Sequence, residues 1–221
     1  MSYIYIVRHG QSVANLDPLQ YKAYTSSDIP LTELGGIQAR SAGSVIKDHA
    51  DNTKERQNNI AVYSSPYLRC VNTTKEILGR LNIDPPIQTN LLLSEISFGE
   101  QEGCNVEEYE HRPAEEHFHD RMGGLQYKPH RGDSFLDVHT RTGLFVVQQR
   151  FFETHSFNII VSHAAVCLML HYFLIAQCPK EHALQLKAHD YWPNTLVRAY
   201  SLASPQSQFE YLGTLNGRDA I

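Results

Sequence analysis

The 221-residue sequence lacks the features that mark several common classes of protein. No apolar run approaches the roughly 18 residues of a membrane span, so we expect no membrane insertion. The first residues already resemble a strand, so we expect neither a signal peptide nor a transit segment and predict a cytoplasmic protein. The net charge is −5 and no basic stripe is present, which argues against nucleic-acid binding as the main task.

Cysteine is also scarce. The four cysteines, Cys70, Cys104, Cys167 and Cys178, form no CxxC pair, so we expect reduced thiols and not a disulfide framework. The composition is otherwise ordinary, because 42% hydrophobic and 19% charged residues suit a globular protein with a substantial core. The length fits one α/β domain, and we predict a single domain over residues 1–221.

A short stretch near the start of the chain carries the first chemical signal. Arg8, His9 and Gly10 follow the apolar run 3–7, which is typical of a short buried strand. Open α/β sheets bind ligands at the carboxyl ends of their strands, and a glycine there lets the backbone turn sharply near a ligand. A neutral imidazole can attack phosphorus, and a guanidinium offers a planar set of donors to phosphate oxygens. We therefore interpret His9 as a candidate nucleophile and Arg8 as a candidate phosphate ligand.

Extended and helical patterns alternate along the rest of the chain, which predicts a mostly parallel sheet covered by helices on both faces. Residues 13–30 lack a clean period and are expected to form a long loop over the site. Strands are expected at residues 3–7, 60–65, 87–93, 157–162, 192–200 and 209–212. Helices are expected from residue 32, at 66–81, at 133–154 and from 164 to 177. The fold class is therefore α/β.

Three further side chains follow strand-like segments. Arg69 lies at the start of the second predicted helix, where both the helix terminus and the guanidinium favour an anion. Glu95 follows the third extended segment, and a carboxyl group with a raised pKa can protonate the leaving oxygen of a phosphate ester. His163 follows the fourth strand and repeats the placement of His9.

These segments resemble the signatures of the histidine phosphatase superfamily, which includes the cofactor-dependent phosphoglycerate mutases. The run R-H-G-Q-S at residues 8–12, with Asn15 beyond it, resembles the first signature, and residues 64–73 resemble the SxxxRxxxT element. Residues 95–103 resemble the ExxxGxxEG run, and the second histidine of the family matches His163. The resemblance implies a three-layer αβα sandwich with a mostly parallel central sheet, as in phosphoglycerate mutase.

The resemblance also implies roles for individual residues. His9 would form a phosphohistidine, Glu95 would act as the proton donor, and His163 would contact the transferred phosphoryl group. The family usually has glycine after the second histidine, where this chain has alanine. No metal or other cofactor is expected, because arginines would supply the positive charge. The expected phosphate ligands are Arg8, Asn15, Arg69 and Ala164.

Two other matches are interpreted as structural. Residues 132–141 resemble the family element GESxxDVxxR, with Asp133 in place of glutamate and Arg141 as its last residue. An aspartate there suits a helix cap, and Arg141 is expected to pair with an acid across the core. Asn194 precedes a strand and resembles a family asparagine near the second histidine.

Hydrolysis of a phosphomonoester is the favoured reaction, and the phosphorylated substrate is either a small metabolite or a phosphoprotein. A mutase uses the same first step, so the motifs do not separate the two reactions. Within the predicted excursion at residues 104–133, residues 104–128 contain many acids and histidines and only three cations, Arg112, Arg121 and Lys128, which favours hydrolysis over a mutase. A non-catalytic binding or regulatory member of the fold is a further alternative, and the sequence leaves open whether the chain forms a homodimer.

Five of the twelve histidines of the chain fall in one stretch, residues 111–139, which overlaps the excursion. Their spacing does not match the tight paired ligands of common zinc sites, so we expect no metal there. We expect the histidines, with nearby aromatic residues, to line the mouth of the active site. The histidines concerned are His111, His117, His119, His130 and His139.

Overall fold

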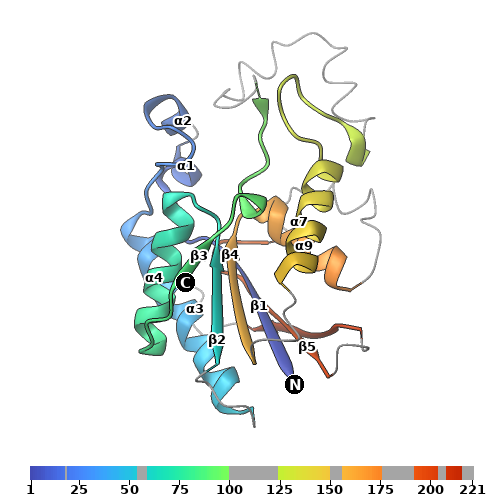
Figure 1. Ribbon diagram of the computed structural model, residues 1–221. Helices are drawn as coiled ribbons and strands as arrows, with labels where there is room; N and C mark the ends of the chain where they lie inside the picture. Colours follow the sequence, from blue (N-terminus) through green and yellow to red (C-terminus); the bar gives the residue numbers. More distant parts are fainter. Residues whose placement is uncertain are drawn as a thin grey trace.

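The computed structural model describes residues 1–17, 19–53, 59–99, 124–149, 156–175, 192–203 and 208–215. Its centre is a six-stranded sheet in the order β3-β2-β4-β1-β5-β6 (Figure 1). The strands are β1 (Ser2–Arg8), β2 (Ile60–Ser64), β3 (Ile87–Thr89), β4 (Phe157–Ser162), β5 (Val197–Leu202) and β6 (Glu210–Leu215).

The sheet is parallel on one side and antiparallel on the other. The pairs β2–β3, β2–β4 and β1–β4 are parallel, whereas β5 pairs antiparallel with both β1 and β6. The parallel strands are each followed by a long connection, as crossovers require, and β4 has all six of its residues buried. The predicted α/β class and the mostly parallel sheet are confirmed.

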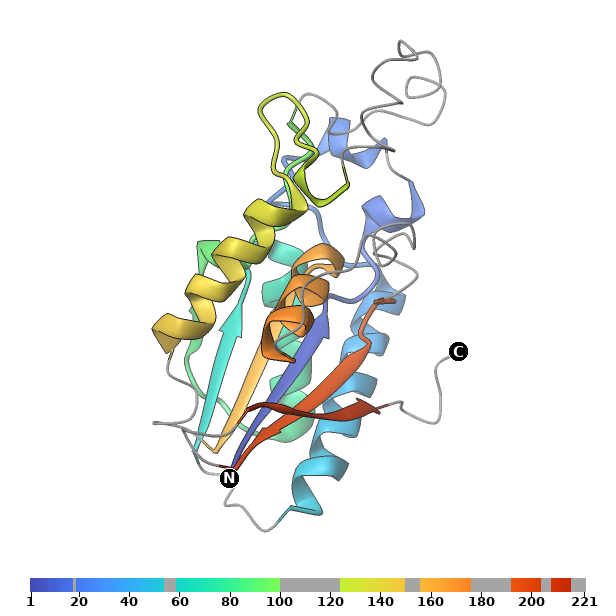
Figure 2. The same cartoon turned by 90° about the vertical axis from the view of Figure 1, so that its right-hand side faces the viewer.

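Two pairs of helices cover the two faces of the sheet, and Figures 1 and 2 show the three layers. On one face, α3 (Glu33–Asp51) and α4 (Leu68–Leu81) pack against alternate strand residues such as Tyr5 and Val7. On the other face, α7 (Phe135–Gln149) and α9 (Ala164–Leu174) pack against the intervening residues such as Ile4 and Ile6. The period-two alternation of β1 thus places a hydrophobic core on each side of the sheet.

Several predicted boundaries were wrong. The loop expected at residues 13–30 contains two short helices, α1 (Val13–Leu16) and α2 (Gln20–Ala23), and α1 begins where the Asn15 side chain accepts a hydrogen bond from the Ser12 amide. The strand expected at 87–93 ends at Thr89 and is followed by the 3₁₀ helix η1 (Leu91–Leu93). That turn forms because the Asn90 side chain accepts from the Leu92 amide.

The ends of other elements also differ from prediction. The strand expected from residue 192 begins at Val197, and the helix expected from residue 133 begins at Phe135. Only residues 124–133 of the predicted excursion are among those described, and they include a 3₁₀ turn, η3 (Gly124–Gln126). None of the helices that the structure describes combines the length and apolar character of a membrane span.

The topology brings three parallel strand ends to one edge of the sheet, which is visible in Figure 2. In the register, Arg8 of β1 lies beside Ser162 of β4, and Ser64 of β2 lies beside Val161. The chain leaves β1 toward α3 on one face but leaves β4 toward α9 on the other. Adjacent strands whose connections diverge in this way leave a crevice at their carboxyl ends, where ligands of open α/β sheets bind.

A backbone contact fixes the turn after β1 against the start of α3. A Cβ atom added at Gly10 would lie 2.3 Å from the carbonyl oxygen of Gly35, and one added at Gly35 would lie 2.1 Å from the carbonyl oxygen of Gln11. The Gly10 amide also donates to the hydroxyl of Thr73 in α4 at 2.9 Å. Glycine is therefore required at both positions for the backbones to meet.

We expect the Gly10→Ala variant to lose about 2–3 kcal/mol of unfolding free energy, because backbone and not a flexible side chain occupies the space. Gly79→Ala, in the exposed part of α4 with nothing within 4 Å of the added Cβ, is the matched control. It is expected to gain about 0.5–1 kcal/mol from helix propensity. Urea unfolding of both variants measures the difference, and equal stability of the two would contradict the contact.

Candidate active site

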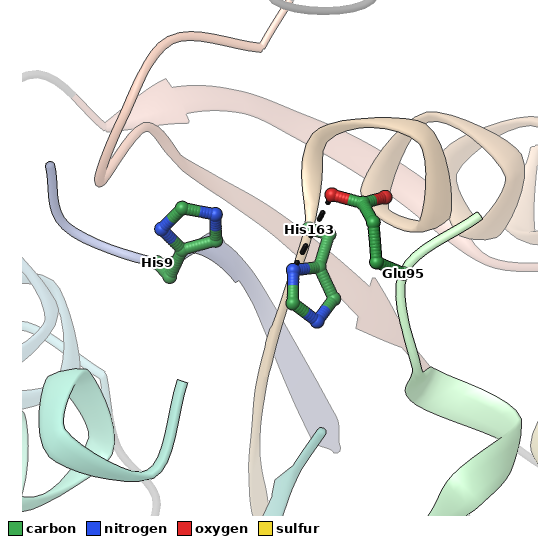
Figure 3. A group of neighbouring side chains, drawn as sticks. All are labelled: His9, Glu95 and His163. Carbon is green, nitrogen blue, oxygen red and sulfur yellow. Dashed lines mark ion pairs between the residues drawn. The ribbon is translucent and has the colours of Figure 1, made fainter. Parts of the chain in front are cut away.

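Three side chains from separate elements converge at the shared strand edge. His9 follows β1, His163 follows β4, and Glu95 lies in the segment after η1, as Figure 3 shows. The His9 and His163 rings are 5.3 Å apart between centroids, and His163 Nδ1 lies 3.4 Å from a Glu95 carboxylate oxygen. The structure therefore brings together the three residues predicted to be catalytic.

The hydrogen bonds of His9 determine its tautomer. Its Nδ1 lies 2.7 Å from the carbonyl oxygen of Gly10, and because a carbonyl only accepts, Nδ1 carries the proton. Its Nε2 accepts from the Nε of Arg69 at 3.3 Å. His9 is therefore the neutral tautomer protonated on Nδ1, and its Nε2 carries the lone pair that accepts from Arg69. This is the state in which an imidazole acts as a nucleophile.

Arg69 is almost completely buried at the start of α4, with 1% of its surface exposed. Besides the bond to His9, its Nη1 donates to the carbonyl oxygen of Ser26 at 2.7 Å, and its guanidinium lies 5.0 Å from the centre of the Tyr67 ring. Its Nη2 is buried and has no hydrogen-bond partner among the described residues. A buried cationic donor left in this way is suited to an anionic ligand.

His163 is completely buried and is held from the opposite side. Its Nε2 lies 2.9 Å from the hydroxyl of Ser65, and the thiol sulfur of Cys70 lies 3.5 Å from the same nitrogen. Burial, followed by the positive charge of Arg69, holds the pKa of His163 well below its usual value. His163 is therefore neutral at pH 7 when no anion is bound.

Glu95 combines a fixed backbone with a shielded carboxyl group. One carboxylate oxygen accepts from the Ile96 amide at 3.0 Å, and 16% of the side chain is exposed. Burial raises the pKa of Glu95, while the positive charge of Arg69 opposes that shift. The carboxyl group thus retains a proton to a higher pH than an exposed glutamate, as a proton donor must.

Arg8 and Asn15 are held by the segment that precedes β5. The Nη1 of Arg8 donates to the carbonyl oxygen of Trp192 at 2.9 Å. The side chain of Asn194 donates to the carbonyl oxygen of His9 at 2.9 Å and to Oδ1 of Asn15 at 3.3 Å. Because Oδ1 of Asn15 is engaged, the exposed amide group of Asn15 is left as a donor.

Ala164 is the first residue of α9, and His163 is its N-cap. Its backbone φ is not in the left-handed region, which among the described residues other than glycine contains only Asn82, Arg131 and Thr195. Alanine therefore fits this position without backbone strain. The amide of Ala164 lies at the N-terminus of an 11-residue helix, an environment that favours negative charge.

The same three convergent residues also have the composition of a metal site. Ligand atoms of His9, Glu95 and His163 all lie within 4.8 Å of one another. However, Arg8 and Arg69 both act electrostatically on Glu95 and His163, and Arg69 touches His9 directly. Two adjacent guanidiniums disfavour a cation, so the electrostatics of the site suit an anion better.

Of the five histidines predicted to line the mouth of the active site, two lie among the described residues. His111, His117 and His119 lie outside the described residues. His130 is exposed, and His139 lies on α7 with its ring 5.9 Å from that of Phe173. His139 therefore packs between helices, which differs from the predicted position at the mouth of the site.

Two neighbours of the site were not recognised as such from the sequence. Ser65 belongs to the SxxxRxxxT element, and its place directly after β2, where the chain turns toward α4, could have indicated a partner for His163. Arg141 was expected to pair with an acid, and it does lie 3.9 Å from Asp133, but it also donates to the carbonyl oxygen of Glu95 at 3.2 Å. That second contact had no local signal, because 46 residues separate the partners.

Similar proteins of known sequence include phosphoglycerate mutases. A 2,3-bisphosphoglycerate-dependent phosphoglycerate mutase of Rhizobium etli is 31% identical over 153 residues, which cover 68% of each chain. The phosphoglycerate mutase-like protein AT74 of Arabidopsis thaliana is 31% identical over 146 residues, 65% of this chain. The matched stretch spans only 45% of the Arabidopsis protein, so the chain covers about half the length of such relatives.

Similar solved structures extend over almost the whole chain. The α-ribazole phosphatase of Shigella flexneri has a TM-score of 0.73 at 20% identity and covers 95% of each chain. A phosphoserine phosphatase of Entamoeba histolytica, solved with phosphoserine, has a TM-score of 0.72 at 20% identity, covering 99% of this chain and 98% of its own. At this identity the likeness shows the shared fold.

A family model matches most of the sequence. The model that describes the histidine phosphatase superfamily (branch 1) matches residues 4–202. The match includes both histidines, both arginines and the glutamate that converge at the strand edge. The chain therefore belongs to the histidine phosphatase superfamily.

Proposed function

We propose that the protein is a phosphatase that hydrolyses a phosphomonoester through a phosphohistidine on His9, without a metal ion. The observation that carries this proposal is the tautomer of His9. The Nδ1 proton is held by the Gly10 carbonyl, so Nε2 carries the lone pair, and the His9 side chain lies beside Arg69, His163 and Glu95. The 3.3 Å hydrogen bond from Arg69 Nε to this nitrogen would pass to a phosphate oxygen before Nε2 attacks. An in-line attack on phosphorus requires a positioned nucleophile and positive charge at the equatorial oxygens.

In the first step, His9 Nε2 forms a bond to phosphorus while the bond from phosphorus to the ester oxygen breaks. Glu95 in its protonated form gives its proton to the departing oxygen, which leaves as an alcohol. Arg8 and Arg69 stabilise the charge on the transferring group, and the buried Nη2 of Arg69 is available for one of its oxygens.

In the second step, water attacks the phosphohistidine and the bond from phosphorus to Nε2 breaks. Glu95, now ionised, removes a proton from the water and is ready to act as the acid again. Inorganic phosphate then leaves. His163, which lies 3.4 Å from Glu95, would take up a proton when the phosphoryl group adds negative charge beside it.

A mutase is the second candidate, because similar sequences include phosphoglycerate mutases. The two reactions differ only in whether water or a hydroxyl of a sugar acid accepts the phosphoryl group. Phosphatases among the similar solved structures support hydrolysis. Incubation with 3-phosphoglycerate and a catalytic amount of 2,3-bisphosphoglycerate separates the candidates, since a mutase forms 2-phosphoglycerate faster than it releases phosphate.

The proposed reaction is tested by release of phosphate from an aryl phosphate in the presence of a chelator. We expect His9→Ala to lower kcat by at least about 10³-fold, because the nucleophile is lost. His49→Gln, on the last turn of α3 with its ring bonded to the Tyr5 hydroxyl at 3.0 Å, is the matched control and should stay within about two-fold. Activity that survives in His9→Ala would contradict a phosphohistidine on His9.

The state of His163 predicts a proton exchange on binding of an anion. Burial holds its pKa well below the usual value, and a dianion beside it would raise that pKa. Sulfate, which does not titrate near neutral pH, should therefore bind with net uptake of about one proton per site at pH 7. Calorimetric titration in buffers of different ionisation enthalpy measures the uptake. Unchanged uptake in His163→Asn would rule out His163 as the acceptor.

A further inference from the structure

We propose that Arg141 is a positioning residue that holds Glu95 in place for proton transfer to the leaving group. The inference rests on the proposed function and assigns a task to a residue outside the converging catalytic side chains. Glu95 lies in the segment 94–98, which has no helix or strand of its own. Its carboxyl group must nevertheless stay within hydrogen-bond reach of the ester oxygen.

Arg141 bridges the backbone on the N-terminal side of this segment and at Glu95 itself. Its Nη1 donates to the carbonyl oxygen of Leu92 at 2.6 Å, and its Nη2 donates to the carbonyl oxygen of Glu95 at 3.2 Å. A planar guanidinium can hold two carbonyls at once in a fixed geometry, whereas an ammonium acts as a single point charge. The side chain is 18% exposed, so water competes weakly for these bonds.

A second set of contacts holds the other side of the segment. Nη2 of Arg141 lies 3.9 Å from a carboxylate oxygen of Asp133, and the same oxygen accepts from the Ser97 amide at 3.2 Å. The Asp133 amide donates in turn to the Ser97 carbonyl oxygen at 2.7 Å. Gly99 and Gly132 permit this approach, since added Cβ atoms would lie 2.1 Å and 2.6 Å from backbone atoms. Glu95 is thus held between two anchored points.

Arg141 itself projects from a rigid base. It lies in α7, whose first turn is closed by reciprocal bonds between Ser134 and Asp137: the Ser134 amide donates to the Asp137 carboxylate at 2.8 Å, and the Asp137 amide donates to the Ser134 hydroxyl at 3.0 Å. The hydrogen bonds of Arg141 therefore tie the segment that carries Glu95 to α7, a helix of the core. Displacement of such an acid by about 1 Å can cost about 10²-fold in rate.

Proton donation matters most when the leaving group is a poor one. An alkoxide needs a proton as it departs, whereas a nitrophenolate leaves readily without one. The contrast is measured in kcat/KM, which covers the steps up to departure of the leaving group and excludes the hydrolysis of the phosphohistidine that both substrates share. The Arg141→Met variant should therefore lower kcat/KM for an alkyl phosphate by about 10- to 100-fold but lower kcat/KM for p-nitrophenyl phosphate by less than about three-fold.

The experiment measures both substrates with the native chain, Arg141→Met, Arg141→Lys and Glu95→Gln, and with the double variant Arg141→Met/Glu95→Gln. Arg141→Lys should recover only part of the loss, because one ammonium cannot replace the bridge. In the Glu95→Gln background, Arg141→Met should have no further effect on the alkyl phosphate, since no proton remains to be positioned. Arg40→Met, from the exposed Arg40–Glu76 ion pair, is the matched control for loss of an arginine and should behave as the native chain.

Failure of the role of Arg141 and failure of the proposed function give different results. Equal losses of kcat/KM for both leaving groups, or full additivity with Glu95→Gln, would overturn the role of Arg141 while leaving the phosphatase intact. If Arg141→Met is unfolded by circular dichroism, the ratio of the two substrates in Arg141→Lys decides the question alone. A native chain inactive with both substrates would overturn the proposed function, and this role with it.

Discussion

The hydrogen bond from His9 Nδ1 to the carbonyl oxygen of Gly10 is the interaction on which the rest of the site depends. It places the proton on one nitrogen and leaves the other as the nucleophile. The carbonyl of Gly10 lies in the backbone just after β1, and the backbones at Gly10 and Gly35 pack there without an intervening side chain. The start of α3 and the Thr73 hydroxyl of α4 therefore both contribute to the state of His9.

The site holds more positive than negative charge. Two buried arginines, two histidines and a glutamate lie together, and burial drives Glu95 and His163 toward their neutral forms. An entering phosphate dianion would supply the missing negative charge, pair with the Nη2 of Arg69 and favour protonation of His163. The same negative charge therefore binds the anion and prepares His163 for the reaction. Burial of these polar groups costs stability in the free protein, where apolar residues would pack at lower cost.

Local patterns were sufficient to predict the features that depend on local sequence. The buried strands before His9 and His163 are runs of apolar residues, and the order of strands and helices led directly to the parallel part of the sheet. The antiparallel pairing of β5 was not predicted, because alternation reports burial and not strand direction. The short helices at 13–23 were missed because four-residue elements carry too few positions for a period.

Contacts between segments far apart in the chain could not be predicted from sequence patterns. The bonds of Asn194 to His9 and of Arg141 to Glu95 join residues 185 and 46 positions apart, and each requires the folded sheet to exist. Both residues were assigned structural roles from the sequence alone, whereas the structure places them against the proposed nucleophile and the proposed proton donor. Tertiary contacts of this kind determine how accurately a recognised motif is positioned.

The central claim is that the phosphoryl group passes through Nε2 of His9. The most direct measurement is rapid mixing of the native chain and of Glu95→Gln with a phosphomonoester, followed by a quench under alkaline denaturing conditions and mass spectrometry of the peptides. The account predicts one phosphoryl group on His9, formed no more slowly than turnover and accumulating in Glu95→Gln when an aryl phosphate supplies a good leaving group. Turnover with an unmodified His9, or with the phosphoryl group on another residue, would contradict it.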